Sequence, residues 1–192
     1  ERGSAGHEAE SPKHGESFFE LVYQVLCASN RVLIDCAYLQ AVDLKYDTEV
    51  VSCEIQGEAS EVGADMGRRA RNRCLSGDRG GFVGGGETTV TLGEVHGMGG
   101  RNQELALAAA FEIAGTGVTL LGCGSDGSDG STVAAGAIVD GTTIDRCNRL
   151  GLDPKRALSE HNAYSIFKAL GDLVVTGPTG TNVMDLQVAV WG

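Results

Sequence analysis

The sequence is poor in several residue types, and each shortage excludes a class of protein. Its 192 residues include only three prolines, and aromatic residues make up 5%. The core must therefore be built mainly from Val, Leu, Ile and Ala. No apolar run approaches the roughly 20 residues that a membrane-spanning helix needs, and residues 1–16 are polar, without the apolar centre of a signal peptide. We expect no membrane partner, and we predict that residues 1–16 form a disordered tail.

Basic residues are also scarce. Lys and Arg total 15 against 26 Asp and Glu, which gives a net charge of -11. A surface that binds nucleic acid needs clustered basic side chains, and the one dense basic run, residues 68–73, suits the solvated face of a helix. We therefore expect no nucleic-acid partner. An acidic protein of this kind binds an anionic substrate through local donors and a divalent metal.

Several sequence motifs are missing or incomplete. The six cysteines form no CxxC pair, which favours reduced, buried thiols in the cytoplasm, with the mitochondrion as the alternative location. No Gly-Lys-Ser/Thr occurs, so a Walker A loop is excluded. His96 and His161 lack the spacing of metal ligands, and we interpret both as surface or structural residues. Residues 122–127 match the dinucleotide pattern GxGxxG only weakly, because the third glycine continues a loop instead of opening a helix.

Apolar periodicity predicts an α/β fold. Strands are expected in the second half of 18–27 and at 48–53, 118–123, 172–176 and 184–191. Helices are expected at 30–44, 58–73, 102–114, 132–139 and 142–151, and two short helices within 153–170. Strand and helix alternate through the first part of the chain, which favours parallel strands with crossover helices. The predicted fold class is a three-layer α/β/α arrangement with a mixed, mostly parallel sheet.

Glycine is abundant, with 29 residues, and it gathers in four loops. In these loops the other residues are mostly Asp, Thr, Asn, Arg or Glu. Glycine lets a backbone approach a ligand closely, and in open α/β sheets ligands bind where such loops follow the strands. Turn formation alone would also explain any single loop, but four similar loops favour a site. We therefore predict that they converge on one cleft. The loops comprise residues 84–90, 97–104, 122–132 and 176–185.

Arg101 is the strongest candidate for catalysis. It follows Gly99 and Gly100 and leads directly into the predicted helix, where free N–H groups attract phosphate or carboxylate. Its guanidinium would add a fixed, planar charge, although Arg101 could also be a surface residue and Asn102 only a helix cap. Because a polar loop residue supplies little core packing, we expect substitution of Arg101 to leave folding nearly untouched.

Asp126 and Asp129 stand in one tight glycine loop after a predicted strand. Two carboxylates so placed are able to hold Mg²⁺, which bridges phosphate oxygens. Aspartates also satisfy the N–H groups of turns, and the sequence leaves both interpretations open.

Five blocks in this order, GGETTV, GGRNQELALA, SDGSDGSTVAAGAIVDG, GLDP with HNAYSIF, and GDLVVTGPTGTNVMDLQV, resemble the MOFRL domain of type 2 glycerate kinases. The resemblance covers roughly residues 81–191 and implies a MOFRL-like domain at 81–192. Residues 17–76 more loosely resemble the end of the family's N-terminal domain, a remnant of a second, Rossmann-like α/β domain. The chain would then be a C-terminal fragment of the enzyme.

The resemblance also implies a function and its residues. It implies ATP and Mg²⁺ as co-substrate and metal, D-glycerate as substrate, 2-phosphoglycerate as product, and a homodimer as an open option for assembly. It places Arg101 in catalysis and Asp126 and Asp129 at the metal. The remaining positions implied in substrate and nucleotide binding are Glu87, Gly99, Gly100, Asn102, Gly124, Thr179, Gly180, Thr181 and Asn182.

Two departures from the family keep alternatives open. Ser131 stands where the family usually has proline, and the segment that bears an important lysine is absent. We therefore expect the chain alone to phosphorylate glycerate feebly or not at all. One alternative is an NAD(P)-dependent hydroxypyruvate reductase, a label that the family has also carried. The other is a catalytically inactive truncated isoform.

Overall fold

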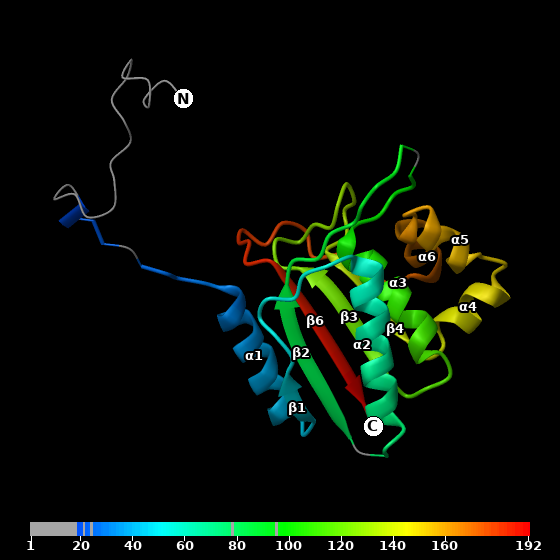
Figure 1. The fold of residues 1–192 in the computed structure, drawn as a ribbon, viewed down its shortest axis with the longest axis horizontal. Helices are drawn as coiled ribbons and strands as arrows, with labels where there is room; N and C mark the ends of the chain where they lie inside the picture. The colour runs from blue at the N-terminus through cyan, green and yellow to red at the C-terminus, as the bar shows by residue number, and fades with distance from the viewer. Residues whose placement is uncertain (1–18, 21, 24, 78, 95) are drawn as a thin grey trace.

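The computed structural model describes residues 19–20, 22–23, 25–77, 79–94 and 96–192, so the predicted tail at 1–16 lies outside the described residues. Within them, six strands form one sheet with helices on both faces (Figure 1). The elements in chain order are α1 (Asn30–Asp43), β1 (Asp47–Val50), α2 (Ala59–Cys74), β2 (Gly80–Gly86), α3 (Arg101–Ile113), β3 (Thr119–Gly124), β4 (Gly136–Asp140), α4 (Thr143–Arg149), α5 (Pro154–Ser159), α6 (Ala163–Leu170), β5 (Leu173–Val174) and β6 (Asp185–Trp191).

The sheet is mixed, as predicted, but it is not mostly parallel. The strand order is β1-β2-β6-β3-β4-β5. Only the β1–β2 pair is parallel, and every other neighbouring pair is antiparallel. The last strand, β6, lies between β2 and β3 and runs against both of them. The prediction fails because it assumes that each strand returns through a crossover helix, whereas β3 returns directly through a loop to β4.

The helix predicted for the segment 132–139 does not form, and this prediction is wrong. The second half of the segment forms β4, which pairs with β3 over Gly136 to Asp140. The alanines in this segment suggest a helix from intrinsic propensity, but backbone pairing with a neighbouring strand overrides that weak preference. Gly136 fits the strand because a Cβ atom there would lie 1.9 Å from the carbonyl oxygen of Gly122. Gly122 and Gly136 are far apart in the sequence, so the local pattern does not reveal that they are in contact.

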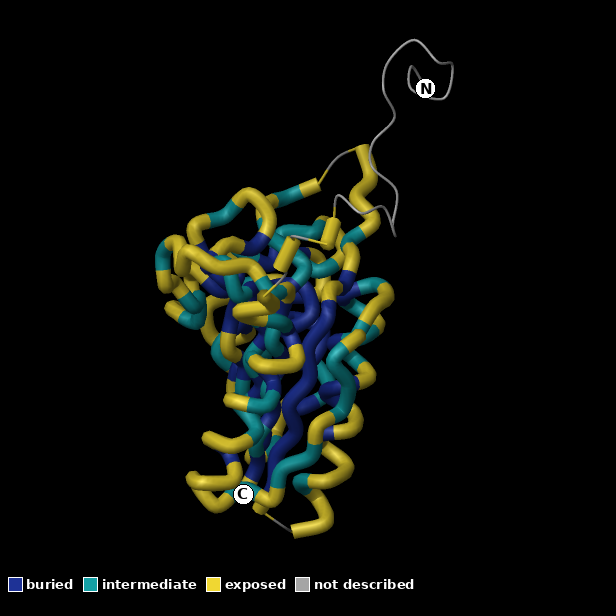
Figure 2. Tube along the Cα trace, turned by 90° about the vertical axis from the view of Figure 1, so that its left-hand side faces the viewer, coloured by how far each residue is buried: buried dark blue, intermediate teal, exposed yellow. Residues whose placement is uncertain are grey.

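The helices form two layers around the sheet. Helix α1 packs on one face against β1 and β2, and α2 and α3 pack on the opposite face, with α4 to α6 beside α3 (Figure 1). Figure 2 shows buried chain running along the strands and the inner helix, with the loops mostly exposed. The core lies between the sheet and α3, and among its fully buried side chains are Phe82, Leu105, Leu107, Ile113, Leu120 and Phe167.

Helices α2 and α3 approach each other closely at two glycines of α2. A Cβ atom at Gly63 would lie 2.1 Å from the carbonyl oxygen of Leu105, and one at Gly67 would lie 2.9 Å from that of Ala109. The two residues are four positions apart and so share one helix face. This contact fixes α3, and with it the position of Arg101 at the first turn of the helix.

Two smaller expectations also change. A strand is predicted in the second half of 18–27, but the described residues there form no regular element. All six cysteines are free, yet only Cys147 is buried, whereas Cys27 and Cys36 are exposed. Among the helices described, none is long and apolar enough to cross a bilayer.

The sheet continues across the predicted domain boundary near residue 80. Strand β1 comes from the 17–76 segment and pairs in register with β2, Asp47 opposite Gly80 and Val50 opposite Val83. Helix α2 of the same segment packs on α3. The first segment thus contributes an edge strand and two covering helices, α1 and α2, to one common sheet.

Candidate functional site

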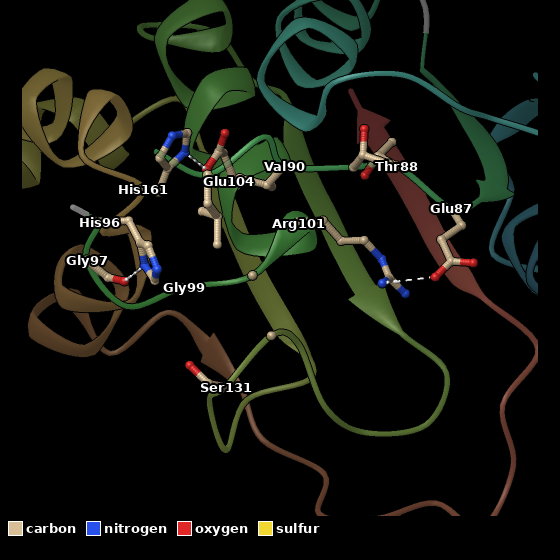
Figure 3. Close-up of a pocket in the computed structure, with 14 residues that line it drawn as sticks. Glu87, Thr88, Val90, His96, Gly97, Gly99, Arg101, Glu104, Ser131 and His161 are labelled. Atoms are coloured by element: carbon tan, nitrogen blue, oxygen red, sulfur yellow. Dashed lines mark hydrogen bonds and ion pairs between the residues drawn. The ribbon is translucent and has the colours of Figure 1, made fainter. Parts of the chain in front are cut away.

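A cavity of about 570 Å³ lies where β2 ends and α3 begins (Figure 3). Strand β2 delivers Glu87 directly after its last residue, and the N-terminus of α3 delivers Arg101. Its volume is in the range of small-molecule sites, roughly 300–1,000 Å³. The lining residues are Glu87, Thr88, Thr89, Val90, Leu92, His96, Gly97, Gly99, Gly100, Arg101, Glu104, Gly130, Ser131 and His161.

The guanidinium of Arg101 is held in one orientation by Asp185, the first residue of β6. Arg101 Nε donates to Asp185 Oδ2 at 2.6 Å, and Nη2 donates to Oδ1 at 2.9 Å. Asp185 is fully buried, whereas the Arg101 side chain is 32% exposed. The remaining nitrogen, Nη1, lies 3.0 Å from Glu87 Oε1, and Glu87 is 54% exposed. The arginine therefore has a buried, fixed side and an open side whose present partner is exchangeable.

This clamp corrects the expectation that Arg101 hardly matters for folding. The hydrogen bonds from Arg101 satisfy a carboxylate that has no access to water. They also raise the pKa of the Arg101 guanidinium above its ordinary value. Removing the arginine would leave a buried charge without its partner, which is one of the costly changes in a folded protein. Arg101 is therefore structural as well as available to a ligand.

Asp129 binds the first turn of α3. Its Oδ1 accepts from the backbone N–H of Asn102 at 3.0 Å, and its Oδ2 accepts from that of Gln103 at 2.9 Å. The side-chain amides of Asn102 and Gln103 also donate to it. The close approach requires Gly100, where a Cβ atom would lie 2.3 Å from Asp129 Cγ. Burial raises the pKa of Asp129, while these hydrogen bonds oppose the rise.

The capping by Asp129 changes the expected role of the helix N-terminus. The N–H groups that were expected to attract a ligand anion at positions 102 and 103 already bind a carboxylate of the protein. Asn102 is buried and bonds to Asp129, so its side chain stands behind the cavity wall. Arg101 remains as the charged donor of this turn that reaches the cavity.

The four glycine loops meet in space, but the prediction of one shared cleft holds for only three of them, because no residue of loop 176–185 lines the cavity. Glu87 and Arg101 join the first two, Asp129 joins the third to α3, and Arg101 with Asp185 joins the second to the fourth. The third and fourth loops meet where Thr179 Oγ1 donates to the Ser125 carbonyl at 2.5 Å. The predicted site residues that lie outside the cavity wall are Asn102, Gly124, Asp126, Asp129, Thr179, Gly180, Thr181 and Asn182.

The described residues do not fit a protein-held Mg²⁺. Across the part of the chain that the structure describes, no group of three or more His, Cys, Asp or Glu side chains is placed to hold a metal. Both oxygens of Asp129 are committed to α3, and Asp126 Oδ1 accepts from the Ser128 backbone N–H at 2.9 Å. The turn-forming alternative for these two aspartates therefore agrees with the geometry.

Sequence reasoning missed a buried pair in the cavity wall, Glu104 and His161. His161 Nδ1 lies 2.9 Å from Glu104 Oε2, and their side chains are 24% and 5% exposed, His161 being the more exposed of the two. Burial raises the pKa of Glu104, and the contact with His161 opposes that rise. Glu104 is three residues after Arg101 and so falls on the same helix face, a signal that was available. His161 is 57 positions away from Glu104, which hides the contact from the sequence.

Comparison with known proteins gives one consistent family. A model described as the MOFRL family matches residues 81–185. The chain is 36% identical over 197 residues to a protein named glycerate 2-kinase from Pyrococcus horikoshii, with 99% of this chain covered. It is 38% identical over 189 residues to a putative hydroxypyruvate reductase from Agrobacterium vitis, with 95% covered. The crystal structure of a glycerate kinase from Thermotoga maritima matches 96% of the chain with a TM-score of 0.89 at 35% identity.

The chain spans less than half the length of these proteins. It covers 43% of the Pyrococcus protein, 42% of the Agrobacterium protein and 44% of the Thermotoga chain. The matched portion includes the whole sheet, the cavity and the Arg101–Asp185 clamp.

Proposed function

The chain belongs to the MOFRL family, and from this membership and the Arg101 geometry we propose that its cavity serves phosphoryl transfer in a glycerate kinase. In the proposed reaction, a hydroxyl oxygen of D-glycerate forms a bond to the γ-phosphorus of ATP. The bond from that phosphorus to ADP breaks, ADP leaves with the electron pair, and the hydroxyl proton passes to water. The names of the relatives, glycerate 2-kinase among them, support 2-phosphoglycerate as the product.

The proposal rests on one observation. Asp185 fixes the guanidinium of Arg101 on its buried side, and the other side of the guanidinium faces the cavity. Phosphoryl transfer depends on positioning and on stabilising the charge of the transferred group, with little covalent chemistry from the protein. A donor that is already oriented needs no reorganisation when that charge develops. Asp185 supplies the orientation, and a phosphoryl oxygen would replace Glu87 at Arg101 Nη1. Magnesium enters the proposal only as the ion that ATP brings with its phosphates.

The reductase alternative has less structural support. A dinucleotide fingerprint needs a helix that begins at its third glycine, so that the pyrophosphate meets the helix N-terminus. In this chain the loop after β3 leads to β4, and Gly127 packs against Gly177, where an added Cβ would lie 2.0 Å from the carbonyl oxygen. The loop after β3 therefore lacks the helix N-terminus that the fingerprint requires.

The decisive experiment couples ADP release to a spectroscopic readout with D-glycerate as acceptor. It should be run on this chain and on the chain joined to the N-terminal part of the Thermotoga relative. We expect strong turnover in the joined protein and feeble turnover, or none, in the chain alone. NADH oxidation with hydroxypyruvate, in the absence of ATP turnover, would replace the proposal with the reductase. Absence of both activities in the joined protein would favour the inactive isoform.

Cytoplasmic or mitochondrial location and a homodimeric assembly are also parts of this proposal. Cell fractionation would test the first, and light scattering of the purified chain would test the second.

A further inference from the structure

The two ends of the cavity differ in chemistry. Figure 3 places Arg101 and Glu87 at one end and the Glu104–His161 pair at the other, with Val90 between them. At the first end, the Arg101 guanidinium can exchange its contact with the exposed Glu87 for a contact with an anionic ligand. The second is bordered by two imidazole rings, those of His96 and His161, and the aliphatic residues Val90 and Leu92 also line the cavity. A ligand that uses both ends must be anionic at one end and flat or apolar at the other.

The His161 ring is held firmly in place. Its Nδ1 lies 2.9 Å from Glu104 Oε2, so Glu104 engages this nitrogen and Nε2 is left for a ligand. The turn that carries His161 is tied to the 97–98 segment, since Gly97 N donates to the Glu160 carbonyl and Met98 N donates to Asn162 Oδ1. The backbone of His161 is left-handed, with φ of 51°, which is uncommon outside glycine and asparagine. Strained residues of this kind often mark ligand sites.

The size of the cavity points to the larger of the two proposed substrates. A three-carbon hydroxy acid would occupy only a small part of about 570 Å³. Leu92 is 51% exposed beside this space, an apolar side chain that the described fold leaves uncovered. Both observations favour a ligand long enough to reach from the arginine to the histidine.

We propose that the His161 end of the cavity is a nucleobase subsite, in which the base of the bound nucleotide stacks on the His161 ring and covers Val90 and Leu92. The proposal rests on the proposed function and assigns the nucleotide, not glycerate, to this cavity. Bases stack on histidine and other flat side chains in proteins, and aliphatic surface beside the ring favours the same ligand by burial. His161 Nε2 then forms a hydrogen bond with a polar group of the nucleoside.

Isothermal titration calorimetry on this chain tests the subsite with three probes: ADP in the presence of magnesium, inorganic diphosphate and adenosine. The variant is His161→Asn, because asparagine tolerates the left-handed backbone. Stacking of one base contributes on the order of tenfold or more in affinity. We expect His161→Asn to weaken ADP about tenfold and to leave diphosphate unchanged. Adenosine should bind weakly to the unmodified chain and compete with ADP.

Glu160→Gln is the matched control, since Glu160 lies on the same turn, outside the cavity wall, with its carboxylate paired to Arg156 on the surface. Glu160→Gln should leave the affinities for ADP and for diphosphate unchanged. Equal weakening of ADP and diphosphate by His161→Asn, or weakening of neither, would overturn the subsite. Diphosphate binding that depends on Arg101, with ADP no tighter, would overturn the subsite while the proposed function stands. Failure of ADP and diphosphate to bind the unmodified chain would overturn the subsite, whereas the proposed function is judged separately by ADP release in the joined protein.

Discussion

The four glycine loops divide into two pairs that use the same residue types differently. Loops 84–90 and 97–104 line the cavity, and they present Glu87 and Arg101 to it. Loop 122–132 adds Gly130 and Ser131 to the cavity wall, but its Asp129 binds α3 and its Ser125 accepts a bond from Thr179 of loop 176–185, which lies outside the wall. One loop composition therefore serves both for contact with a ligand and for bracing the fold. The two uses differ in whether the polar atoms already have partners.

Arg101 and Asp185 join the two kinds of loop, so substitution of Arg101 is expected to have the largest effect. In the protein joined to the N-terminal part of the Thermotoga relative, Arg101→Ala should lower kcat by about 10²–10³, the usual loss when one fixed donor to a charged transition state is removed. It should also lower the free energy of unfolding by about 2–3 kcal/mol, because Asp185 stays buried without its partner. This value is below that for a fully buried pair, since Arg101 is 32% exposed. Assays of ADP release and urea denaturation measure the two effects.

Arg101→Lys separates the two roles. An ammonium keeps the charge but loses the bidentate fork, so part of the stability should return while kcat stays low. Near-normal kcat in either variant would remove Arg101 from the reaction. Unchanged stability in Arg101→Ala would contradict the structural importance of the clamp.

Asp129 and Asp126 allow a comparison within a single bracing loop. Asp129→Asn cannot accept with both side-chain atoms and leaves a buried N–H group of α3 unpaired, which should cost about 2–3 kcal/mol. Asp126→Asn keeps an amide oxygen that accepts the same bond from the Ser128 N–H in a partly exposed turn, so it should cost less than about 0.5 kcal/mol. Thermal and urea unfolding of both variants measure the difference. Equal costs would show that Asp129 does not brace α3, and loss of magnesium-dependent ADP binding in both variants with folding intact would restore the metal interpretation.

The long helices are predictable from the sequence because they depend on local periodicity, whereas the glycine-rich strand β2 is not predicted. Helices α1, α2 and α3 begin and end within two residues of their predicted bounds. Strand direction is predicted wrongly, because it is decided by which strands pair, and the insertion of β6 between β2 and β3 joins residues about 100 positions apart. The roles of individual polar residues are likewise decided by contacts between distant parts of the chain. Asp185 and His161 act through partners far away in the chain, and no spacing in the sequence reveals them.

Thr179 tests the bracing pair of loops with a smaller effect. Thr179→Val keeps the shape of the side chain and removes the bond from Oγ1 to the Ser125 carbonyl. Because the residue is exposed, we expect a loss of about 0.5–1 kcal/mol in unfolding free energy. Diphosphate affinity should not change, since Thr179 lies outside the cavity wall. A fall in diphosphate affinity at unchanged stability would place Thr179 among the residues that contact a ligand, as its sequence position suggests.

The smallest expected effect concerns the pH dependence of stability at Glu104. Its folded-state pKa is raised, first by burial and further by the charges of Glu58 and Asp129, with His161 opposing. Between the ordinary pKa and the raised one, the native state retains a proton that the unfolded chain has released. Stability therefore falls as pH rises through this window and levels off above it. Glu104→Gln has no such proton, so its unfolding free energy should fall less over the same range.

Urea unfolding from about pH 4 to about pH 8 measures this slope in the unmodified chain and in Glu104→Gln. Asp129 has a raised pKa as well, so a part of the slope remains in the variant. Glu160→Gln removes an exposed carboxylate and serves as the control. A slope that is the same in Glu104→Gln as in the unmodified chain would show that the buried pair at the His161 end does not hold its proton differently in the folded state. A reduced slope would show that Glu104 holds its proton more tightly in the folded state, as its burial indicates.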